Sequence, residues 1–257
     1  MGAVHGCYLK YVGVSLTSWA LASLLHPAPD LARRALDATG DAPPWRLAGA
    51  TALYYSCLVN GLIAVLFKSR RGTGIIGKDS EKGTIPLWSY CIFAPFHLPT
   101  MLYTYVHAQQ MARKGIPVAS EVVPGWWIGG RYGHLLGRRW SCVVDLTVEF
   151  PERCRAHAAA YVHVPLWDGN PPTPEQLEHA ASAAAAALKQ GGRDGGVLVH
   201  CAHGVGRSTT VMCACLVRVG KFSTWEEAFE ACRPGRPCIK LNAAMRQALS
   251  EWQTKYN

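Results

Sequence analysis

The pattern of apolar and polar positions divides this chain into two parts of different character. Up to residue 117 the apolar residues form long uncharged stretches, namely Tyr11–Leu25, Leu47–Phe67 and Ile85–Val106. From residue 118 onward they form short runs, separated by turn residues and by stretches with helical signals. Long uncharged stretches are typical of membrane helices, and strands that alternate with helices indicate a mainly parallel sheet. We therefore expect a membrane region of two to three apolar helices over 1–117 and an α/β domain over 118–257.

The three apolar stretches differ in how well they suit a bilayer. Leu47–Phe67 is the best candidate for a span, because it is long enough and carries no charge; a buried core helix is the alternative. Tyr11–Leu25 is short, so both a membrane helix and an interfacial segment remain open. Ile85–Val106 contains Pro95 and Pro99, which predict a kink or a re-entrant segment.

Short apolar runs in the second part predict the strands. The predicted strands lie within Glu121–Gly130, Ser141–Phe150, Ala159–Thr173 and Val197–His200. The strand in Ala159–Thr173 continues into a proline-rich loop. Thr173 is expected to cap a helix, because Pro174 and Gln176 stand at the first-turn and capping-box positions. Three more helices are expected to begin near Arg207, Ser223 or Thr224, and Asn242.

Charge and cysteine content narrow the setting of the chain. The net charge is +9 and comes mostly from residues 1–117, where 11 Lys and Arg stand against 5 Asp and Glu. Basic residues beside long apolar stretches indicate a lipid bilayer as partner, and the sequence lacks the basic–aromatic stripe of a nucleic-acid-binding protein. The ten cysteines are scattered without a C-x2-C pair, which disfavours a disulfide framework and a metal site. We expect reduced cysteines, no bound metal and no nucleic-acid partner.

The basic loop Lys68–Thr84 bears on the topology. Its Lys and Arg side chains are expected to be solvated, and the positive-inside rule places such a loop in the cytoplasm. If the third apolar stretch then crosses the bilayer, the C-terminal domain lies on the opposite side, which conflicts with a reduced thiol. We favour a multi-pass membrane protein whose C-terminal domain is cytosolic.

The stretch Gly195–Gly220 carries the clearest chemical signal. It is typical of a strand, a glycine-rich turn and a helix that starts near Arg207. Such a junction turns backbone N–H groups into one concavity, the helix N-terminus adds positive charge, and Gly204 and Gly206 permit the tight curl. Arg207 can hold two oxygens of a phosphate group. Cys201 in this field is expected to be a thiolate and a nucleophile.

His200-Cys201, five further residues and Arg207-Ser208 together resemble the signature loop of the cysteine-dependent phosphatases. The C-x-x-G-x-x-R-S form is similar to that of the dual-specificity phosphatases, and the resemblance extends over roughly 118–257. It implies an α/β fold with a mainly parallel sheet flanked by helices, and no cofactor. It also implies that Cys201 is the nucleophile, that Arg207 holds the phosphate and that Ser208 donates to the departing sulfur. The substrate-binding loop would comprise Ala202, His203, Gly204, Val205, Gly206 and Arg207.

Asp168 is the candidate general acid. It stands 33 residues before Cys201 on a loop after a strand, as the acid of the family does, and a thiolate nucleophile needs such a proton donor for the leaving group. A turn-capping role beside Gly169 is the alternative, and His163 is a weaker candidate for the acid. The resemblance gives supporting roles to three further residues, a neutral His200 and the structural pair Asp145 and Glu149.

Three functions fit this constellation. The loop interior AHGVG contains no lysine, unlike the phosphatases of polyphosphorylated inositols, so a highly anionic headgroup is disfavoured. A phosphoprotein carrying phosphotyrosine and/or phosphoserine/threonine is the leading substrate. A membrane phospholipid monophosphate is the first alternative, because the apolar stretches place the chain at a bilayer. A phosphate-binding pseudophosphatase is the second, although the intact Cys201, Arg207 and Asp168 argue against it.

Overall fold

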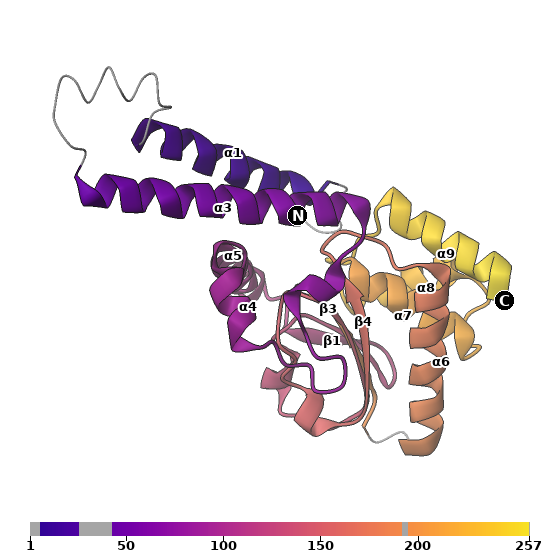
Figure 1. Ribbon diagram of the computed structural model, residues 1–257. Helices are drawn as coiled ribbons and strands as arrows, with labels where there is room; N and C mark the ends of the chain where they lie inside the picture. The colour runs from indigo at the N-terminus through magenta and orange to yellow at the C-terminus, as the bar shows by residue number, and fades with distance from the viewer. Residues whose placement is uncertain (1–5, 26–42, 192–194, 257) are drawn as a thin grey trace.

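The structure is a computed structural model that describes residues 6–25, 43–191 and 195–256. It consists of an α/β domain and a pair of long helices that project from it (Figure 1). The helices are α1 (Tyr8–Leu25), α3 (Pro44–Ser69), α4 (Leu87–Ile92), α5 (Ala94–Arg113), α6 (Pro174–Gly191), α7 (Arg207–Arg218), α8 (Trp225–Cys232) and α9 (Ala243–Tyr256). The strands are β1 (Ala119–Val123), β2 (Trp126–Gly129), β3 (Trp140–Thr147), β4 (Ala158–Leu166) and β5 (Val197–His200). Short 3-10 helices are η1 (Thr73–Ile76), η2 (Gly133–Leu136) and η3 (Arg155–His157).

The strands form one sheet in the order β1-β2-β5-β3-β4. The pairs β2–β5, β5–β3 and β3–β4 are parallel, which confirms the predicted mainly parallel sheet, whereas β1 and β2 are antiparallel. The sequence predicts a single strand within Glu121–Gly130. Gly125 has φ +81° and turns the chain back on itself, so this stretch supplies two strands.

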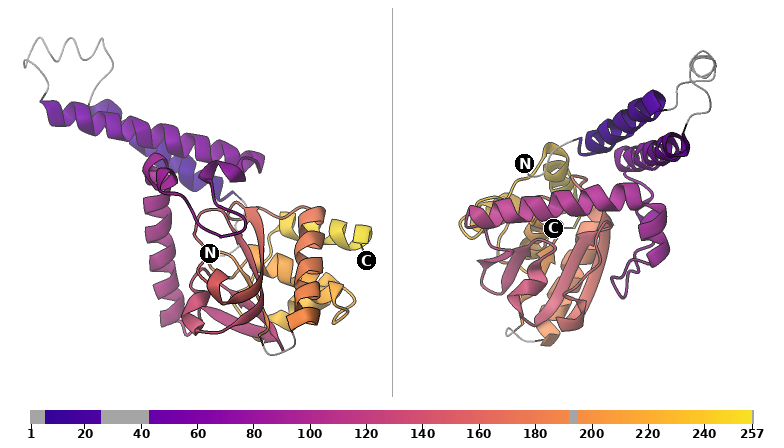
Figure 2. Two further views of the ribbon diagram at one scale, coloured as in Figure 1. Left: turned by 60° about the horizontal axis from the view of Figure 1, so that its bottom comes forward. Right: turned by 90° about the vertical axis from the view of Figure 1, so that its left-hand side faces the viewer.

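Helices α6 to α9 pack on one face of the sheet, and α5 passes along the other side (Figure 2). The main core lies under α6 to α9, and its largest fully buried side chains include Trp126, Leu177 and Trp252. Helix α7 is buried from Arg207 to Val217, because most of its side chains are small or apolar. This burial fixes the first turn of α7, which continues the glycine-rich turn after β5.

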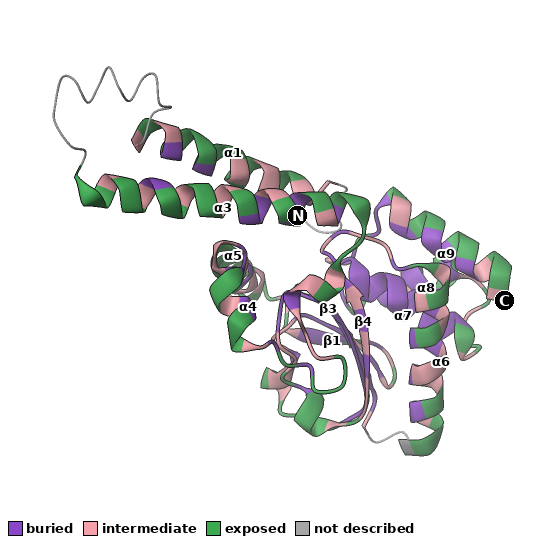
Figure 3. Cartoon of the chain, in the orientation of Figure 1, coloured by how far each residue is buried: buried purple, intermediate pink, exposed green. Residues whose placement is uncertain are grey.

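Helices α1 and α3 lie side by side, and most positions along them are exposed or half-buried (Figure 3). Hydroxyl groups make part of their contact: Ser18 Oγ lies 3.0 Å from Ser56 Oγ, and Ser15 Oγ donates to the Cys57 carbonyl at 2.9 Å. Interfaces of small and hydroxyl-bearing residues between helices with apolar outer faces are typical of membrane bundles. Many large apolar side chains of the two helices are exposed, among them Leu16, Trp19, Leu24, Leu58 and Val65, whereas Val59, Ile63 and Phe67 of α3 are buried.

Among the described residues, α3 is the one helix that is long and apolar enough to cross a membrane. The predicted third stretch is divided, since α4 ends at Ile92 and α5 begins at Ala94, with Pro95 in its first turn and Pro99 inside it. The break confirms the predicted kink. It leaves two helices in place of one continuous span.

The chain between α3 and α4 is here called the strap (residues 70–86). The basic loop Lys68–Thr84 was expected to be solvated, which holds for exposed cations such as Arg70 and Lys82 but was wrong for Lys78. The Trp167 indole N–H donates to the Arg71 carbonyl at 2.8 Å. The Lys78 side chain is only 2% exposed, and its ammonium pairs with Asp145 on β3. The strap therefore packs on the α/β domain, because a buried carboxylate of the sheet holds one of its cations.

Candidate active site

Three loops meet at the carboxyl ends of the parallel strands. Glu149 follows β3, Asp168 follows β4 and Cys201 follows β5. Parallel strands bring their carboxyl ends to one edge of a sheet, where open α/β folds bind their ligands. Arg207, in the first turn of α7, completes the set, with its Nη2 3.4 Å from Asp168 Oδ1. The structure thus brings the predicted nucleophile, phosphate-binding arginine and acid together.

Cys201 lies at this edge with 4% of the residue exposed. Its sulfur accepts a hydrogen bond from the Gly204 N–H at 3.3 Å and lies 3.4 Å from Ser208 Oγ. Burial by itself raises the pKa of the thiol. The Arg207 guanidinium and hydrogen bonds from the Ser208 hydroxyl and backbone N–H groups outweigh burial, so the pKa of Cys201 lies below its ordinary value. The site therefore favours a thiolate.

In the predicted substrate-binding loop, residues 202–207, backbone carbonyls accept hydrogen bonds from neighbouring segments. The Ala202 carbonyl accepts from the Arg131 N–H at 3.2 Å, and the Val205 carbonyl accepts from the Lys240 N–H at 3.0 Å. Because these carbonyls are engaged by neighbouring segments, the N–H groups of the loop remain to form an anion-binding concavity.

Gly204 is the loop position that requires glycine. Its φ is +70°, and a Cβ there would lie 2.6 Å from the carbonyl carbon of Gly129. Gly206 was also expected to permit the curl, but its φ of −111° lies outside the left-handed region. Arg236, which is 1% exposed, holds the curl from outside: Nε donates to the Gly204 carbonyl at 2.7 Å and Nη2 to the His203 carbonyl at 3.1 Å.

The guanidinium of Arg207 is buried and held in one orientation. Nη1 donates to the carbonyls of Leu166 at 2.6 Å and Leu146 at 3.2 Å, and Nη2 donates to Glu149 Oε1 at 2.7 Å. Nε has no hydrogen-bond partner in the described part of the chain. The Nε–H and the Nη2–H on the side of Asp168 are therefore the donors left for a bound oxyanion.

The loop that carries Asp168 is fixed from two sides. Trp167 stacks on Phe67 of α3 with ring centroids 4.5 Å apart, and the Asn242 amide donates to the Gly169 carbonyl at 3.0 Å. The Asp168 side chain is 35% exposed. Burial raises its pKa, but the neighbouring guanidinium outweighs this and keeps the pKa of Asp168 below its ordinary value. Without substrate, Asp168 is therefore a carboxylate.

Comparison with known sequences decides the family. The profile of the dual specificity phosphatase catalytic domain matches residues 139–255. This part of the chain belongs to the dual specificity phosphatase family. The matched part contains the predicted nucleophile Cys201, the predicted phosphate-binding Arg207 and the predicted acid Asp168.

Individual relatives match parts of the chain. It is 34% identical over 83 residues to dual specificity protein phosphatase 22-B of Danio rerio, which covers 32% of this chain and 45% of that protein. It is 43% identical over 65 residues to a probable rhodanese domain-containing dual specificity protein phosphatase of Dictyostelium discoideum, covering 25% of this chain and 13% of that protein. The chain thus spans less than half the length of both relatives. A solved mouse putative dual specificity phosphatase complexed with zinc tungstate superposes with a TM-score of 0.48 at 24% identity, over 54% of this chain and 88% of that one.

His200 of the phosphatase domain is not the neutral group that the resemblance implies. Its Nε2 pairs with Glu152 and lies 3.7 Å from Asp145 Oδ1. Burial lowers the pKa of His200, but the two carboxylates outweigh burial and raise it to about 9, so the imidazole is protonated at neutral pH. Asp145 also accepts from Lys78 and, at 3.0 Å, from the Tyr161 hydroxyl. Two cations and two carboxylates therefore form a buried network directly before Cys201.

The three groups Asp145, Glu152 and His200 have the donor types of a metal site and lie close together. The Lys78 ammonium already neutralises Asp145 and also donates to the Thr147 carbonyl at 2.8 Å. A protonated imidazole has no lone pair for a metal. We therefore assign the cluster as a charge network that ties the strap to β3 and β5 beside the signature loop.

Glu149 and His163 have different surroundings. Both carboxylate oxygens of Glu149 accept hydrogen bonds from the Arg207 guanidinium, at 2.7 and 3.3 Å. The structural role expected for Glu149 is therefore to orient Arg207. His163 Nε2 lies 3.0 Å from the Thr147 carbonyl, and Nδ1 lies 3.2 Å from Ser80 Oγ of the strap. These contacts join His163 to the strap side of the sheet, and they make it a poor proton donor for the site.

Removing the Lys78 ammonium is expected to destabilise the chain. Lys78→Met leaves the fully buried Asp145 without its closest cation, and breaking a buried ion pair in this way costs about 3–5 kcal/mol. Lys82→Met is the matched control, because Lys82 belongs to the same strap and is exposed. Denaturant unfolding of both full-length variants in detergent, followed by tryptophan fluorescence, measures the difference. Equal free energies of unfolding would show that the buried pair does not hold the strap.

Two cavities flank His203 at the rim of the phosphatase site. A cavity of about 180 Å³ lies between Asp168 and His203 on one side and helices α1, α3 and α5 on the other. A cavity of about 320 Å³ lies between His203 and the C-terminal half of α5. His203 contacts Tyr103 and His107 of α5, with ring centroids 5.8 and 4.2 Å away. Burial lowers the pKa of His203 to about 3, so it is a neutral rim residue.

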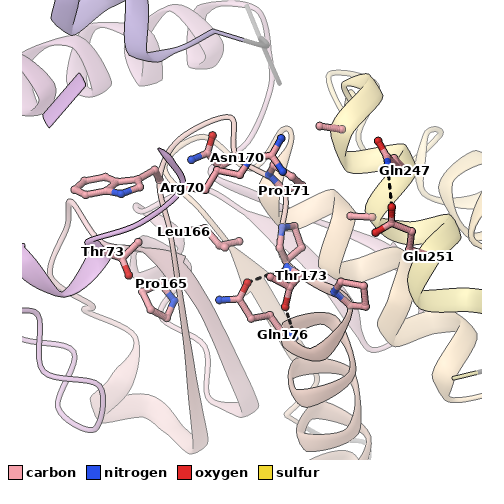
Figure 4. Close-up of a pocket in the computed structure, with 15 residues that line it drawn as sticks. Arg70, Thr73, Pro165, Leu166, Asn170, Pro171, Thr173, Gln176, Gln247 and Glu251 are labelled. Carbon is pink, nitrogen blue, oxygen red and sulfur yellow. Dashed lines mark hydrogen bonds between the residues drawn. The ribbon is translucent and has the colours of Figure 1, made fainter. Parts of the chain in front are cut away.

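A further cavity of about 290 Å³ lies beyond the acid loop (Figure 4). It is lined by Arg70 of the strap, by the loop 170–174 and by Gln247 and Glu251 of α9. Among the described residues that line it, none is a member of the phosphate-binding loop. This cavity is therefore separate from the phosphatase site.

Proposed function

We propose that the chain is a phosphoric monoester hydrolase that works through a phosphocysteine intermediate. The observation that carries this proposal is the buried Cys201 sulfur beside Arg207, whose Nε is unpaired among the described groups while its Nη atoms are held. Membership of the dual specificity phosphatase family supports the same chemistry. The test is the release of inorganic phosphate from a small aryl phosphate by the full-length protein in detergent. A phosphate-binding pseudophosphatase would bind phosphate and release none.

In the first step the Cys201 thiolate attacks phosphorus, and an S–P bond forms as the P–O bond to the leaving group breaks. The phosphate oxygens take the free donors of Arg207 and displace Asp168 from the guanidinium. Losing that cation and meeting the negative phosphate both raise the pKa of Asp168. Asp168 then holds the proton that it delivers to the leaving oxygen.

In the second step water attacks phosphorus, the S–P bond breaks and inorganic phosphate leaves. Asp168, now ionised, accepts a proton from the attacking water. Ser208 Oγ, 3.4 Å from the sulfur, donates to the departing thiolate and stabilises its charge. The thiolate is restored at the end of the cycle.

The names of the relatives and the site itself support two candidate substrate classes. The relatives named above are protein phosphatases by name, which supports phosphotyrosine and/or phosphoserine/threonine of proteins as substrates. The lysine-free loop interior suits a single phosphate group. A membrane phospholipid monophosphate is the second candidate, because the cavity beside Asp168 is walled by the N-terminal helices.

We also propose that the chain is anchored in a membrane, with α3 as its principal span and the phosphatase domain in the cytosol. The exposed apolar side chains of α1 and α3 and the hydroxyl contact between them support the anchor, and the free thiols of cysteines such as Cys142, Cys154 and Cys213 suit a reducing compartment. The same proposal is multi-pass, and α1 and the α4–α5 pair are the candidates for further spans.

The anchor predicts that the full chain stays in the membrane pellet after alkaline carbonate washing. Arginine at the centre of a membrane helix costs about 2.5–3.5 kcal/mol per residue. A Leu58→Arg, Leu62→Arg variant, changed on the exposed side of α3, is therefore expected to move to the supernatant. Immunoblotting of pellet and supernatant measures where the unmodified chain and the variant are found. Recovery of the unmodified chain in the supernatant would contradict the anchor.

A further inference from the structure

The 180 Å³ cavity lies where the leaving group of a substrate has to sit. In the proposed function, on which this inference rests, Asp168 protonates the leaving oxygen. The remainder of the leaving group must therefore extend past Asp168, away from the Cys201 sulfur. Asp168 lines this cavity together with Ala202 and His203 of the phosphate-binding loop. The cavity thus receives the part of the substrate that determines specificity.

The opposite walls of this cavity come from the N-terminal helices. They include Lys10 and Val14 of α1, Phe67 of α3, and Pro99 and Tyr103 of α5. Apolar and aromatic side chains predominate among them, and Lys10 adds one positive charge to the lining. Such walls suit an amphiphile with an anionic head.

Cationic and aromatic side chains mark two levels along α1 and α3. At the end next to the phosphatase domain, Lys68 Nζ lies 5.9 Å from the centroid of the Tyr8 ring. At the far end the Arg46 guanidinium lies 6.0 Å from the Trp45 ring. Between Arg46 and Lys68 the helix carries no charge. Its length there is about 33 Å at 1.5 Å per residue, close to the roughly 30 Å of a hydrocarbon core, and Lys, Arg, Tyr and Trp collect at the two membrane interfaces.

Lys10 places one part of the cavity wall at the level of the interface next to the domain. Its ammonium lies 4.5 Å from the Tyr103 ring, the same kind of pair as at Lys68, and it lines the cavity. Val14 lies one helical turn further along α1, in the direction of the far interface. The cavity therefore begins at the level of lipid headgroups and continues toward the apolar region.

From this geometry we propose that the substrate is a membrane phospholipid ending in a single phosphate monoester, with its phosphate at Cys201 and its glycerol portion in the cavity. A lipid leads away from its phosphate in one direction, which one cavity accommodates. A phosphorylated residue in a protein continues as polypeptide in two directions, and both would have to pass α1 and α5. The S–P bond forms as the lipid alcohol leaves with the proton of Asp168, and water then releases inorganic phosphate.

The experiment uses the purified full chain in mixed micelles with four probes: phosphatidic acid, glycerol 3-phosphate, a phosphotyrosine peptide and a small aryl phosphate. We expect kcat/KM for phosphatidic acid to exceed those for glycerol 3-phosphate and the peptide by at least about tenfold. A preference for the peptide, or aryl phosphate turnover without phosphatidic acid turnover, overturns the lipid proposal. Absence of turnover with every probe overturns the proposed function itself.

A pair of tryptophan variants on α1 tests the cavity. Val14→Trp fills it, whereas Leu16→Trp adds the same side chain at a position that is 62% exposed and does not line it. We expect the ratio of kcat/KM for phosphatidic acid to that for the aryl phosphate to fall about tenfold in Val14→Trp and to stay unchanged in Leu16→Trp. An unchanged ratio in Val14→Trp would show that the cavity does not select the leaving group.

Discussion

Replacing Cys201 with serine is expected to abolish phosphate release and to preserve phosphate binding. A serine hydroxyl stays protonated at neutral pH, so the charge and hydrogen bonds that favour the Cys201 thiolate no longer yield a nucleophile. Removing the nucleophile of a covalent mechanism costs on the order of 10⁶-fold in rate. Binding persists, because Arg207 and the loop N–H groups are unchanged. Aryl phosphate hydrolysis and calorimetric titration with inorganic phosphate measure the two effects.

The exposed Cys91 of α4 provides the matched control, since Cys91→Ser makes the same exchange outside the site. In the unmodified chain, kcat/KM is expected to rise with pH as the Cys201 thiol ionises. Because the pKa of Cys201 is depressed, kcat/KM should rise at a pH below the ordinary thiol pKa of about 8.5. Phosphate release that survives in Cys201→Ser would exclude the phosphocysteine mechanism.

Asp168→Asn is expected to slow the hydrolysis of substrates with poor leaving groups by about 10²–10⁴-fold, the usual contribution of a general acid. Asparagine keeps the shape of the side chain and cannot deliver a proton. The effect should shrink for an activated aryl phosphate, whose departing oxygen needs little protonation. Rates for alkyl, phenyl and activated aryl phosphates measure this dependence.

The pH profile separates the acid from a merely structural Asp168. The acid works while protonated, so the rate falls as pH rises through the pKa that Asp168 has with phosphate bound. In Asp168→Asn this descending limb should flatten, and the ascending limb of the Cys201 thiol should remain. Equal slowing of all substrates with an intact descending limb would mean that another group is the acid. Because His163 bonds to Thr147 and Ser80, another carboxylate would then be sought.

The signature region could be predicted because its chemistry is local in the chain. Cys201, Gly204 and Arg207 lie within seven consecutive residues, and the strand before them and the helix after them fix their relative positions. The position of Asp168 beside Arg207 followed from its spacing to Cys201 and its place after a strand, while its role as the acid stays a prediction. The parallel sheet followed from the alternation of strands and helices, and only the turn at Gly125 was missed.

The supporting residues were not predictable, because their partners lie far away in the sequence. Lys78 reaches Asp145 across 67 residues, and it looks like any other cation of a basic loop until the fold is known. Arg236 holds the Gly204 carbonyl across 32 residues in the same way. The apolar stretches indicated helices, but no pattern within them shows that α1, α3 and α5 wall the cavity beside the acid.

If the chain is anchored in a membrane as proposed, the strap fixes the height of the phosphatase domain above that anchor. With Lys78 buried against Asp145 and Trp167 stacked on Phe67, no slack chain separates α3 from the sheet within residues 70–86. A domain on a flexible linker samples a large volume. A domain packed directly on its membrane anchor instead encounters substrates that diffuse laterally in the same membrane. Turnover should accordingly follow the surface density of substrate in the enzyme's own bilayer, and substrate on a facing membrane should remain out of reach.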